Sequence, residues 1–427
     1  MKQKLILLLT TLLIIFVFTE IIFTIIVDED LDGNMSLNYI HLKPFELPIL
    51  ETQKKIDRLN NSKVPDSLAE NYEGKNFKRT YFNVRLIPDS TLGWVPNPYF
   101  KSNDALYIYN RNVIRSNDLL TEYSDKKKLR IAIFGDSYAH GDEVKFENTI
   151  GYYLESKLTE LNIASEVLNF AVSGYGMDQA YLRWKKVKEE YNPDIVILGV
   201  QFENVKRHIN IMRPFYYHTT EIPYSKPRYI IQTNKLQLIN NPIRKVENTV
   251  DIIKQFSNWK FVNFEGFYIQ QDYHPSFLYY SKTISFIASA ISQIFSEIDY
   301  YKPTSESYKV TYKIFDNFRK NLEAENITFI PVHLPVKNDF DFLTSYFLKL
   351  NYNQKFIYDD IFAALKLKHK FAEPFGQLES WSQNNSIDEL FVKRHYSAQS
   401  NKIIADNIFQ FLKKETPTLF SKTKENN

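Results

Sequence analysis

Two hydrophobic patterns divide the chain. One is a continuous apolar run over residues 5–27 whose single charge is Glu20. The other is an alternation of short apolar runs with segments of helical spacing. The apolar runs cover residues 129–134, 167–171, 194–200, 327–332 and 355–358, and the helical segments cover 149–161, 178–190 and 398–413. Strand-like runs alternating with helices predict an α/β fold with a parallel sheet covered on both faces.

The first run predicts a transmembrane signal-anchor over residues 1–28. A helix of this length can cross a hydrocarbon core of about 30 Å. Two lysines precede the run and three acids, Asp28 to Asp30, follow it. The positive-inside rule therefore predicts a cytoplasmic N-terminus and an extracytoplasmic domain. A cleaved signal peptide is the alternative, but its apolar region would be shorter and followed by small residues.

The remaining chain predicts three parts. Residues 29–128 are polar and rich in turns, which indicates a juxtamembrane stalk and an N-terminal extension that packs on the core. Residues 129–415 carry the α/β pattern, with an aromatic-rich insertion at about 206–300, and residues 416–427 form a polar tail. The insertion's aromatic residues predict a satellite core, or alternatively a lid or a sugar-stacking wall over an active site. Its isoleucines from Ile284 to Ile298 predict an amphipathic packed helix and not a second membrane span.

Composition excludes several function classes. The 427 residues carry a net charge of +3 without a basic stripe, so we expect no nucleic-acid partner. Cysteine is absent, which excludes disulfides, thiolate metal sites and a cysteine nucleophile. No histidine pair has metal-ligand spacing and no glycine-rich phosphate loop occurs, so we expect neither metal nor cofactor.

Residues suited to acyl transfer follow three of the predicted strands. Ser137 follows the first strand in IAIFGDS, Gly174 follows the second and Asn204 the third, while His395 precedes the last helix. The carboxyl ends of parallel strands share one sheet edge, where α/β folds bind ligands. An imidazole can activate a serine hydroxyl, and backbone N–H groups with an amide can hold an oxyanion. His140 and His333 are the runner-up bases.

These blocks resemble the SGNH (GDSL-type) hydrolase superfamily, and GDSYAHGDEV, GYGMDQ and PDIVILGVQFEN are similar to its bacterial membrane-anchored envelope members. The resemblance covers residues 129–415. It implies a three-layer, flavodoxin-like α/β fold that acts on acyl esters, including O-acetyl groups of glycans, without metal or cofactor. It also implies that Ser137 is the nucleophile, that Ser137, Gly174 and Asn204 form the oxyanion hole, and that His395 is the base.

The sequence departs from the family at the histidine. An aspartate usually stands two or three residues before it, but here those positions are Lys393 and Val392. Asp388 and Glu389 are the nearest acids, and Asp359 or Asp360 could approach from the end of the predicted strand at 355–358. A Ser–His dyad without an acid is the remaining alternative. The third block, which usually reads Asn-Asp, here continues from Asn204 to Val205.

The sequence thus predicts a serine esterase that acts on acyl, chiefly O-acetyl, esters of envelope glycans or lipids through an acyl-enzyme. One alternative is an O-acetyltransferase that uses the same Ser137–His395 pair and an acyl-donor partner protein. The other is a catalytically degenerate protein that binds glycans or assists assembly on the same fold. A carboxylate near Nδ1 of His395 would argue against that second alternative.

Overall fold

The computed structural model describes residues 2–37, 40–64, 81–122, 128–340 and 355–421. The chain divides into two compact units. The N-terminal unit comprises Met1–Arg58, Asn210–Ser225 and Lys245–Tyr300, and the sheet unit comprises Leu59–Ile209, Lys226–Arg244 and Tyr301–Asn427. Most of the insertion predicted from the sequence thus clusters with the N-terminal segment.

A four-stranded parallel sheet forms the centre of the sheet unit. Its strands are β6 (Leu129–Phe134), β7 (Ser165–Asn169), β8 (Ile195–Val200) and β11 (Thr328–His333), in the order β11-β8-β6-β7. This arrangement confirms the predicted parallel α/β class. The chain goes from β6 to one neighbour, β7, and then returns to the other, β8, so β6 stands at the point where the strand order reverses. Ligands of open α/β sheets bind outside the carboxyl ends of the strands at such a point.

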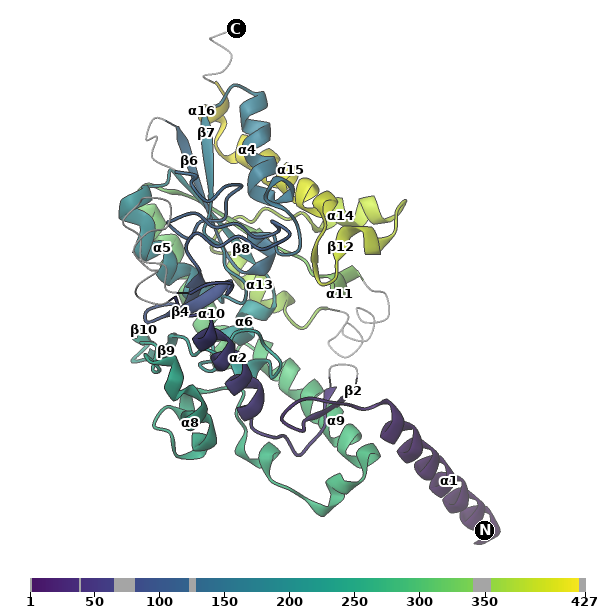
Figure 1. Cartoon of the computed structure of the whole chain (residues 1–427). Coiled ribbons are helices and arrows are strands. Elements are labelled where there is room, and N and C mark those ends of the chain that lie inside the picture. The colour runs from purple at the N-terminus through teal and green to yellow at the C-terminus, as the bar shows by residue number, and fades with distance from the viewer. Residues whose placement is uncertain (1, 38–39, 65–80, 123–127, 341–354, 422–427) are drawn as a thin grey trace. The chain divides into compact units, whose positions relative to one another are not determined.

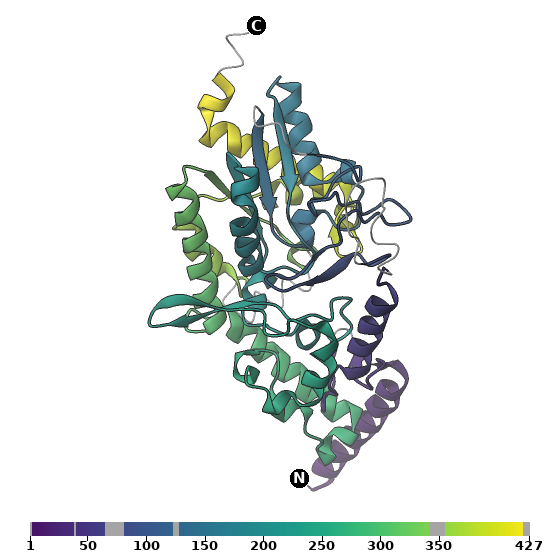
Figure 2. The same cartoon turned by 60° about the vertical axis from the view of Figure 1, so that its left-hand side comes forward.

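Helices cover both faces of this sheet (Figures 1 and 2). On one face, α4 (Ile150–Glu160) and α15 (Ala398–Glu415) share a core with Ile131 and Ile133 of β6. On the other lie α5 (Met177–Tyr191) and α10 (Glu306–Ala324), where the Phe318 ring of α10 packs 5.3 Å from that of Trp184. Successive side chains of a strand point to opposite faces, which explains why β6 is apolar on both faces from Ile131 to Phe134.

The predicted strand at residues 355–358 is wrong. These residues form a turn that leads into α13 (Asp359–Lys366), and the backbone N–H of Phe356 donates to the Asp359 carboxylate at 3.0 Å. The Phe356 and Tyr358 rings stack at 5.1 Å, and Tyr358 stacks on Phe202 at 5.3 Å. The apolar run is therefore buried through aromatic packing and not through pairing in the sheet.

Shorter elements complete the sheet unit. The hairpins are β4 (Leu86–Asp89) with β5 (Gly93–Pro96), β9 (Arg228–Gln232) with β10 (Lys235–Ile239), and β12 (Phe391–Val392) with β13 (His395–Tyr396). The helices are α3 (Ser137–His140), α6 (Glu203–Arg207), α11 (Lys337–Phe340), α14 (Phe375–Ser382) and α16 (Pro417–Ser421).

The N-terminal unit begins with α1 (Lys2–Ile26), a helix long and apolar enough to cross a membrane. Small strands β1 (Asp28–Glu29), β2 (Met35–Leu37) and β3 (Ile40–His41) follow, then α2 (Ile49–Asn61), which continues into the sheet unit. The insertion adds α7 (Arg213–Tyr216), α8 (Thr249–Lys254) and α9 (Lys282–Tyr301).

Aromatic rings form the core of the inserted segments. Phe215 and Phe256 are buried with their ring centroids 4.3 Å apart, and Tyr268 packs on both. The buried Glu265 carboxylate accepts the backbone N–H groups of Ile211 and Met212, each at 2.7 Å. This part of the insertion is therefore the satellite core that the sequence predicts.

Gly135 offers a test of how tightly the end of β6 is packed. Its φ is +149°, and a Cβ there would lie 2.8 Å from Ala139 Cβ and 3.1 Å from Gly199 O. We expect Gly135→Ala to lower the free energy of unfolding by about 1–3 kcal/mol. The backbone conformation is strained for alanine, and the added Cβ would also overlap with Ala139 and Gly199. Chemical denaturation of the detergent-solubilised chain measures this change.

Gly376 of α14 supplies the matched control, since a Cβ there would meet nothing within 4 Å. We expect Gly376→Ala to leave stability unchanged or raise it by about 0.5–1 kcal/mol through helix propensity. Equal effects of the two substitutions would contradict the close packing at Gly135.

Candidate active site

Ser137 lies in a tight turn at the carboxyl end of β6. Asp136 caps the short helix α3, and its Oδ1 accepts the backbone N–H of Tyr138 at 3.0 Å. Ser137 is 8% exposed, so the residue as a whole is buried in this turn. The structure thus places this serine at the edge of the sheet where the strand order reverses.

The buried Asp136 carboxylate connects this turn to the loop after β8. Its Oδ2 accepts Gln201 Nε2 at 2.8 Å, Arg207 Nη1 at 2.9 Å and Asn204 Nδ2 at 3.3 Å. Asn204 belongs to α6 and is itself buried. An amide carries two N–H donors, so the bond to Asp136 leaves Asn204 one for a ligand.

The loop after β7 carries Gly174, whose φ of +80° is the left-handed conformation that favours glycine. The backbone N–H of Val172 in this loop donates to Gly135 O at 3.1 Å. Trp94 of β5 holds the next residues, because its Nε1 donates to Ser173 O at 3.0 Å and its carbonyl accepts the Tyr175 hydroxyl at 2.6 Å. Hydrogen bonds therefore tie the loops that carry Gly174 and Asn204 to the turn of Ser137.

His395 lies in β13, against the residue that follows Ser137. Its ring packs 5.0 Å from that of Tyr138, and the Tyr138 hydroxyl donates to Arg394 O at 2.8 Å. Tyr138 also packs against Tyr396 at 5.0 Å. These contacts fix the strand of His395 beside α3, which brings the imidazole close to the turn of Ser137.

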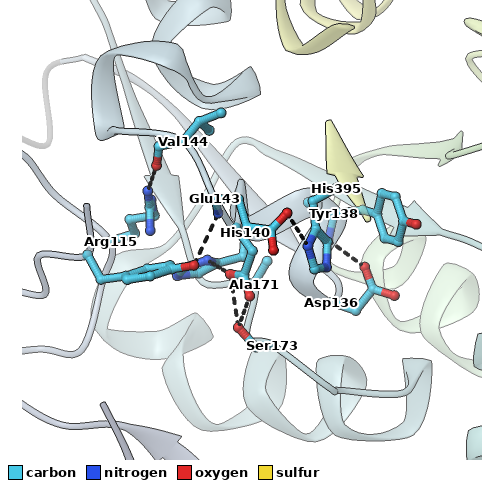
Figure 3. A network of polar contacts seen from close by, with 12 residues as sticks. Arg115, Asp136, Tyr138, His140, Glu143, Val144, Ala171, Ser173 and His395 are labelled. Atoms are coloured by element: carbon cyan, nitrogen blue, oxygen red, sulfur yellow. Dashed lines mark hydrogen bonds and ion pairs between the residues drawn. The ribbon is translucent and has the colours of Figure 1, made fainter. Parts of the chain in front are cut away.

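Glu143 is the carboxylate that faces His395 (Figure 3). Its Oε2 lies 3.3 Å from His395 Nδ1, and the two side chains are 18% and 19% exposed. Both atoms are buried, and neither makes a hydrogen bond within the described part of the chain. The backbone of Glu143 has a φ of +70°, and its N–H donates to the Tyr107 hydroxyl at 3.1 Å. The carbonyl of the following residue, Val144, accepts a hydrogen bond from Arg115 Nη2 at 2.5 Å.

Asp388 and Glu389, the acids expected to orient His395, are both exposed on the surface. The Asp388 side chain is 79% exposed and pairs with Lys337 at 2.6 Å. The expectation that Asp388 or Glu389 lies beside His395 is therefore wrong, and the carboxylate that the structure places there is that of Glu143. The correction has a physical reason: the residues before β13 form an exposed 3-10 turn, Ile387–Leu390, whose acids point to solvent.

Asp142, next to Glu143, belongs to a buried network behind the site. It accepts His140 Nδ1 at 2.5 Å, Ser173 Oγ at 2.7 Å and Arg85 Nη1 at 3.3 Å. Burial opposes ionisation, but Arg85 and His140 hold the pKa of Asp142 well below its usual range. This carboxylate therefore stays charged and fixes the short loop that carries Glu143.

The runner-up bases are structural. Burial, aided by Arg115, lowers the pKa of His140 to about 4 even though Asp142 opposes the shift, and Tyr109 Oη lies 3.0 Å from His140 Nε2. His333 is packed on Phe362 with ring centroids 3.9 Å apart, and burial lowers its pKa to about 3. A neutral imidazole with both nitrogens engaged, as in His140, cannot take a proton from Ser137. Among the described residues, no three His, Asp or Glu side chains gather as metal ligands.

Together these groups suit acyl transfer. A serine in a tight turn, an imidazole beside it and a carboxylate at the far ring nitrogen form the arrangement that activates a hydroxyl for attack on a carbonyl. Asn204 and the N–H groups of the turns are the donors available to an oxyanion.

Solved structures similar to the chain include three bacterial proteins. An esterase from Pseudoalteromonas is 11% identical, and the match covers 67% of this chain and 98% of that one with a TM-score of 0.33. An Axe2 acetyl-xylooligosaccharide esterase mutant from Geobacillus is 11% identical, with 66% of this chain and 92% of that one covered and a TM-score of 0.36. A lipolytic G-D-S-L family member from Veillonella parvula is 10% identical, with 66% of this chain and 96% of that one covered and a TM-score of 0.32. The last is described by the family that the sequence motifs resemble. No protein-family model and no curated protein sequence matches the chain.

The pKa of His140 makes stability depend on pH. The folded pKa of about 4 lies below the ordinary 6.5, so the unfolded chain takes up this proton first as the pH falls. We therefore expect the free energy of unfolding to fall between about pH 6.5 and 4. Between neutral pH and pH 5, His140 alone should lower the free energy of unfolding by about 2 kcal/mol.

Denaturation of wild type and His140→Gln at several pH values measures this contribution, because glutamine does not titrate. The variant should keep the slope contributed by His208, whose pKa burial lowers to about 4, and lose the part due to His140. An identical pH slope in both proteins would show that the pKa of His140 is the same in the folded and the unfolded chain, which would contradict its lowered value.

Proposed function

We propose that this chain is a membrane-anchored serine esterase with Ser137 as nucleophile, His395 as base and Glu143 as the acid that orients the base. The observation that carries the proposal is the 3.3 Å contact of Glu143 Oε2 with Nδ1 of an imidazole packed beside the Ser137 turn. This contact favours the enzyme over a catalytically degenerate binding protein, for which the missing acid was the argument.

The proposed reaction has two steps. His395 Nε2 takes the proton from Ser137 Oγ as the oxygen attacks the ester carbonyl, and the same proton then passes to the leaving alkoxide oxygen. The acyl group remains on Ser137 until water, deprotonated by His395, attacks and releases the carboxylic acid. The N–H groups of Ser137 and Gly174 and the Asn204 amide hold the oxyanion in both steps. Glu143 keeps the proton on Nδ1, so that Nε2 faces the serine as acceptor.

The substrate class follows from context. We propose acyl, chiefly O-acetyl, esters of envelope glycans or lipids, because α1 would hold the site at a membrane surface. The lysines before α1 and the acids after it place the sheet unit on the extracytoplasmic side in this proposal. A transferase would use the same acyl-enzyme with a sugar hydroxyl in place of water. Incubation of the acetylated enzyme with glycan acceptors distinguishes the two.

Ser137→Ala tests the nucleophile. We expect hydrolysis of nitrophenyl acetate by the full chain in detergent to fall by at least about 10³-fold, since no hydroxyl remains to form the acyl-enzyme. Circular dichroism of the variant shows whether it is folded. Full activity in a folded variant would exclude Ser137, and inactivity of the wild type would leave transfer or binding as its role.

Glu143→Gln tests the orienting acid. We expect kcat to fall by roughly 10²–10⁴-fold with little change in KM, because the amide keeps the size of the side chain but not the charge that fixes the imidazole. Glu143→Asp should retain more activity than Glu143→Gln.

Asp388→Asn is the matched control for this test. It removes an acid close to His395 in sequence that the structure places on the surface. We expect its kcat to match that of the wild type. A loss in Asp388→Asn and none in Glu143→Gln would reverse the assignment.

A further inference from the structure

Helix α9 of the N-terminal unit has its polar and apolar faces reversed relative to a helix of a water-soluble protein. Its small polar residues face inward, where Ser289 Oγ accepts Lys43 N at 2.9 Å and Ser285 Oγ donates to Lys43 O at 2.5 Å. Ser285 and Ser289 are buried. A surface helix in water normally turns its apolar stripe to the core and its polar side outward.

The outward face of α9 is apolar. Ile287, Ile291 and Ile294 are each 51% exposed, and Phe295 is 65% exposed. The 3-10 turn just before the helix, Phe277–Tyr280, is also apolar and exposed, with Phe277 at 79% and Tyr280 at 90% exposure. Several large apolar side chains exposed on one helix face mark a contact with another protein or with a membrane.

The start of α9 is bound to the membrane-spanning candidate α1. The Glu20 carboxylate of α1 accepts Ser281 Oγ at 2.7 Å and the backbone N–H groups of Lys282 and Thr283 at 2.7 and 3.0 Å. An acid at this position satisfies the free N–H groups of the α9 N-terminus and complements the helix dipole. The Phe23 and Phe286 rings pack 5.0 Å apart just beyond this contact. Figures 1 and 2 show α1 and α9 side by side there.

This contact sets the depth of α9. Glu20 stands six residues before the end of α1 at Ile26, which is about 9 Å at 1.5 Å per residue. If α1 crosses a bilayer, the start of α9 therefore lies below the level at which α1 leaves it. Amphipathic helices in the membrane interface bury their apolar face by about 5–10 Å, which is the same depth.

We propose that the outward face of α9, with the turn Phe277–Tyr280, is embedded in the leaflet at the C-terminal end of α1. This inference rests on the proposed anchor and goes beyond the proposed reaction. The bilayer is the occupant because Glu20 joins this surface to a helix that itself has no buried residue and a mean hydropathy of 2.8. Phe277 and Tyr280 are then interfacial aromatic anchors, and hydrogen bonds from the start of α9 stabilise the Glu20 carboxylate, so it is not left unpaired in lipid.

Site-directed fluorescence on the full chain tests the proposal, since the native sequence has no cysteine. Single cysteines are introduced as Ile291→Cys, Gln293→Cys and Ile14→Cys, labelled with bimane and reconstituted in palmitoyl-oleoyl-phosphatidylcholine vesicles containing doxyl-labelled phosphatidylcholine. Gln293 is the matched control, because it is exposed on the same helix but about 200° around the axis from Ile291. Ile14, 64% exposed in α1, reports the anchor itself.

We expect strong quenching at Ile14 and Ile291 and several-fold weaker quenching at Gln293. Quenching at Ile14 with equal, weak quenching at Ile291 and Gln293 would overturn the docking of α9 while leaving the anchor intact. Weak quenching at Ile14 as well would overturn both the anchor and this inference. The proposed esterase activity is tested separately, because its loss in an unlabelled Ser137→Ala variant does not depend on where α1 or α9 lies. Pyrene excimer emission from Ile291→Cys, abolished by dilution with unlabelled chain, would show that a second copy covers this face and would overturn the proposal.

Discussion

The candidate site depends on one buried carboxylate, that of Asp136. It caps the turn of Ser137 and accepts hydrogen bonds from Gln201, Asn204 and Arg207, so it joins the ends of β6 and β8. A buried charge is stable only when it is paired and hydrogen-bonded, and Asp136 satisfies this with a guanidinium, two amides and a backbone N–H. The positions of Ser137 and Asn204 are therefore coupled, because a shift of either loop would remove hydrogen bonds from this buried charge.

A second constraint places the acid. Asp142 and Glu143 are consecutive, yet one side chain faces a buried cluster of Arg85, His140 and Ser173 and the other faces His395. The positive φ of Glu143 accomplishes this reversal within one residue. Strained backbone of this kind persists where surrounding contacts hold it, and here the Tyr107 hydroxyl accepts the Glu143 N–H while Arg115 donates to the carbonyl of the next residue, Val144. Glu143 thus reaches His395 from the loop that follows Ser137 and not from the strand that carries His395.

Local pattern predicted the parallel sheet but not the carboxylate that faces His395. The strands β6, β7, β8 and β11 were predictable because each contains a buried apolar stretch, and Ser137, Gly174 and Asn204 because they follow such stretches. The expected acids, Asp388 and Glu389, were chosen by distance along the chain to His395, whereas Glu143 reaches it across the fold. GDEV did contain Glu143, but a positive φ at a glutamate has no sequence signal. The strand predicted at residues 355–358 was wrong for a similar reason. Buried aromatic residues suit a turn that packs on Phe202 as well as they suit a strand.

The N-terminal helix also contributes to the fold around it, which bears on whether it is retained. Glu20 satisfies two backbone N–H groups of α9, and Ser281 Oγ, itself bound to Glu20, accepts a third from Ile284 at 3.2 Å. Removal of α1 would leave the α9 N-terminus without its acid and Phe286 without the Phe23 ring. A cleaved signal peptide has no reason to form such contacts with the mature chain. Glu20 is the only charge in the apolar run, and it is also the residue that binds α1 to α9. This contact favours an anchor that is retained over a signal peptide that is cleaved.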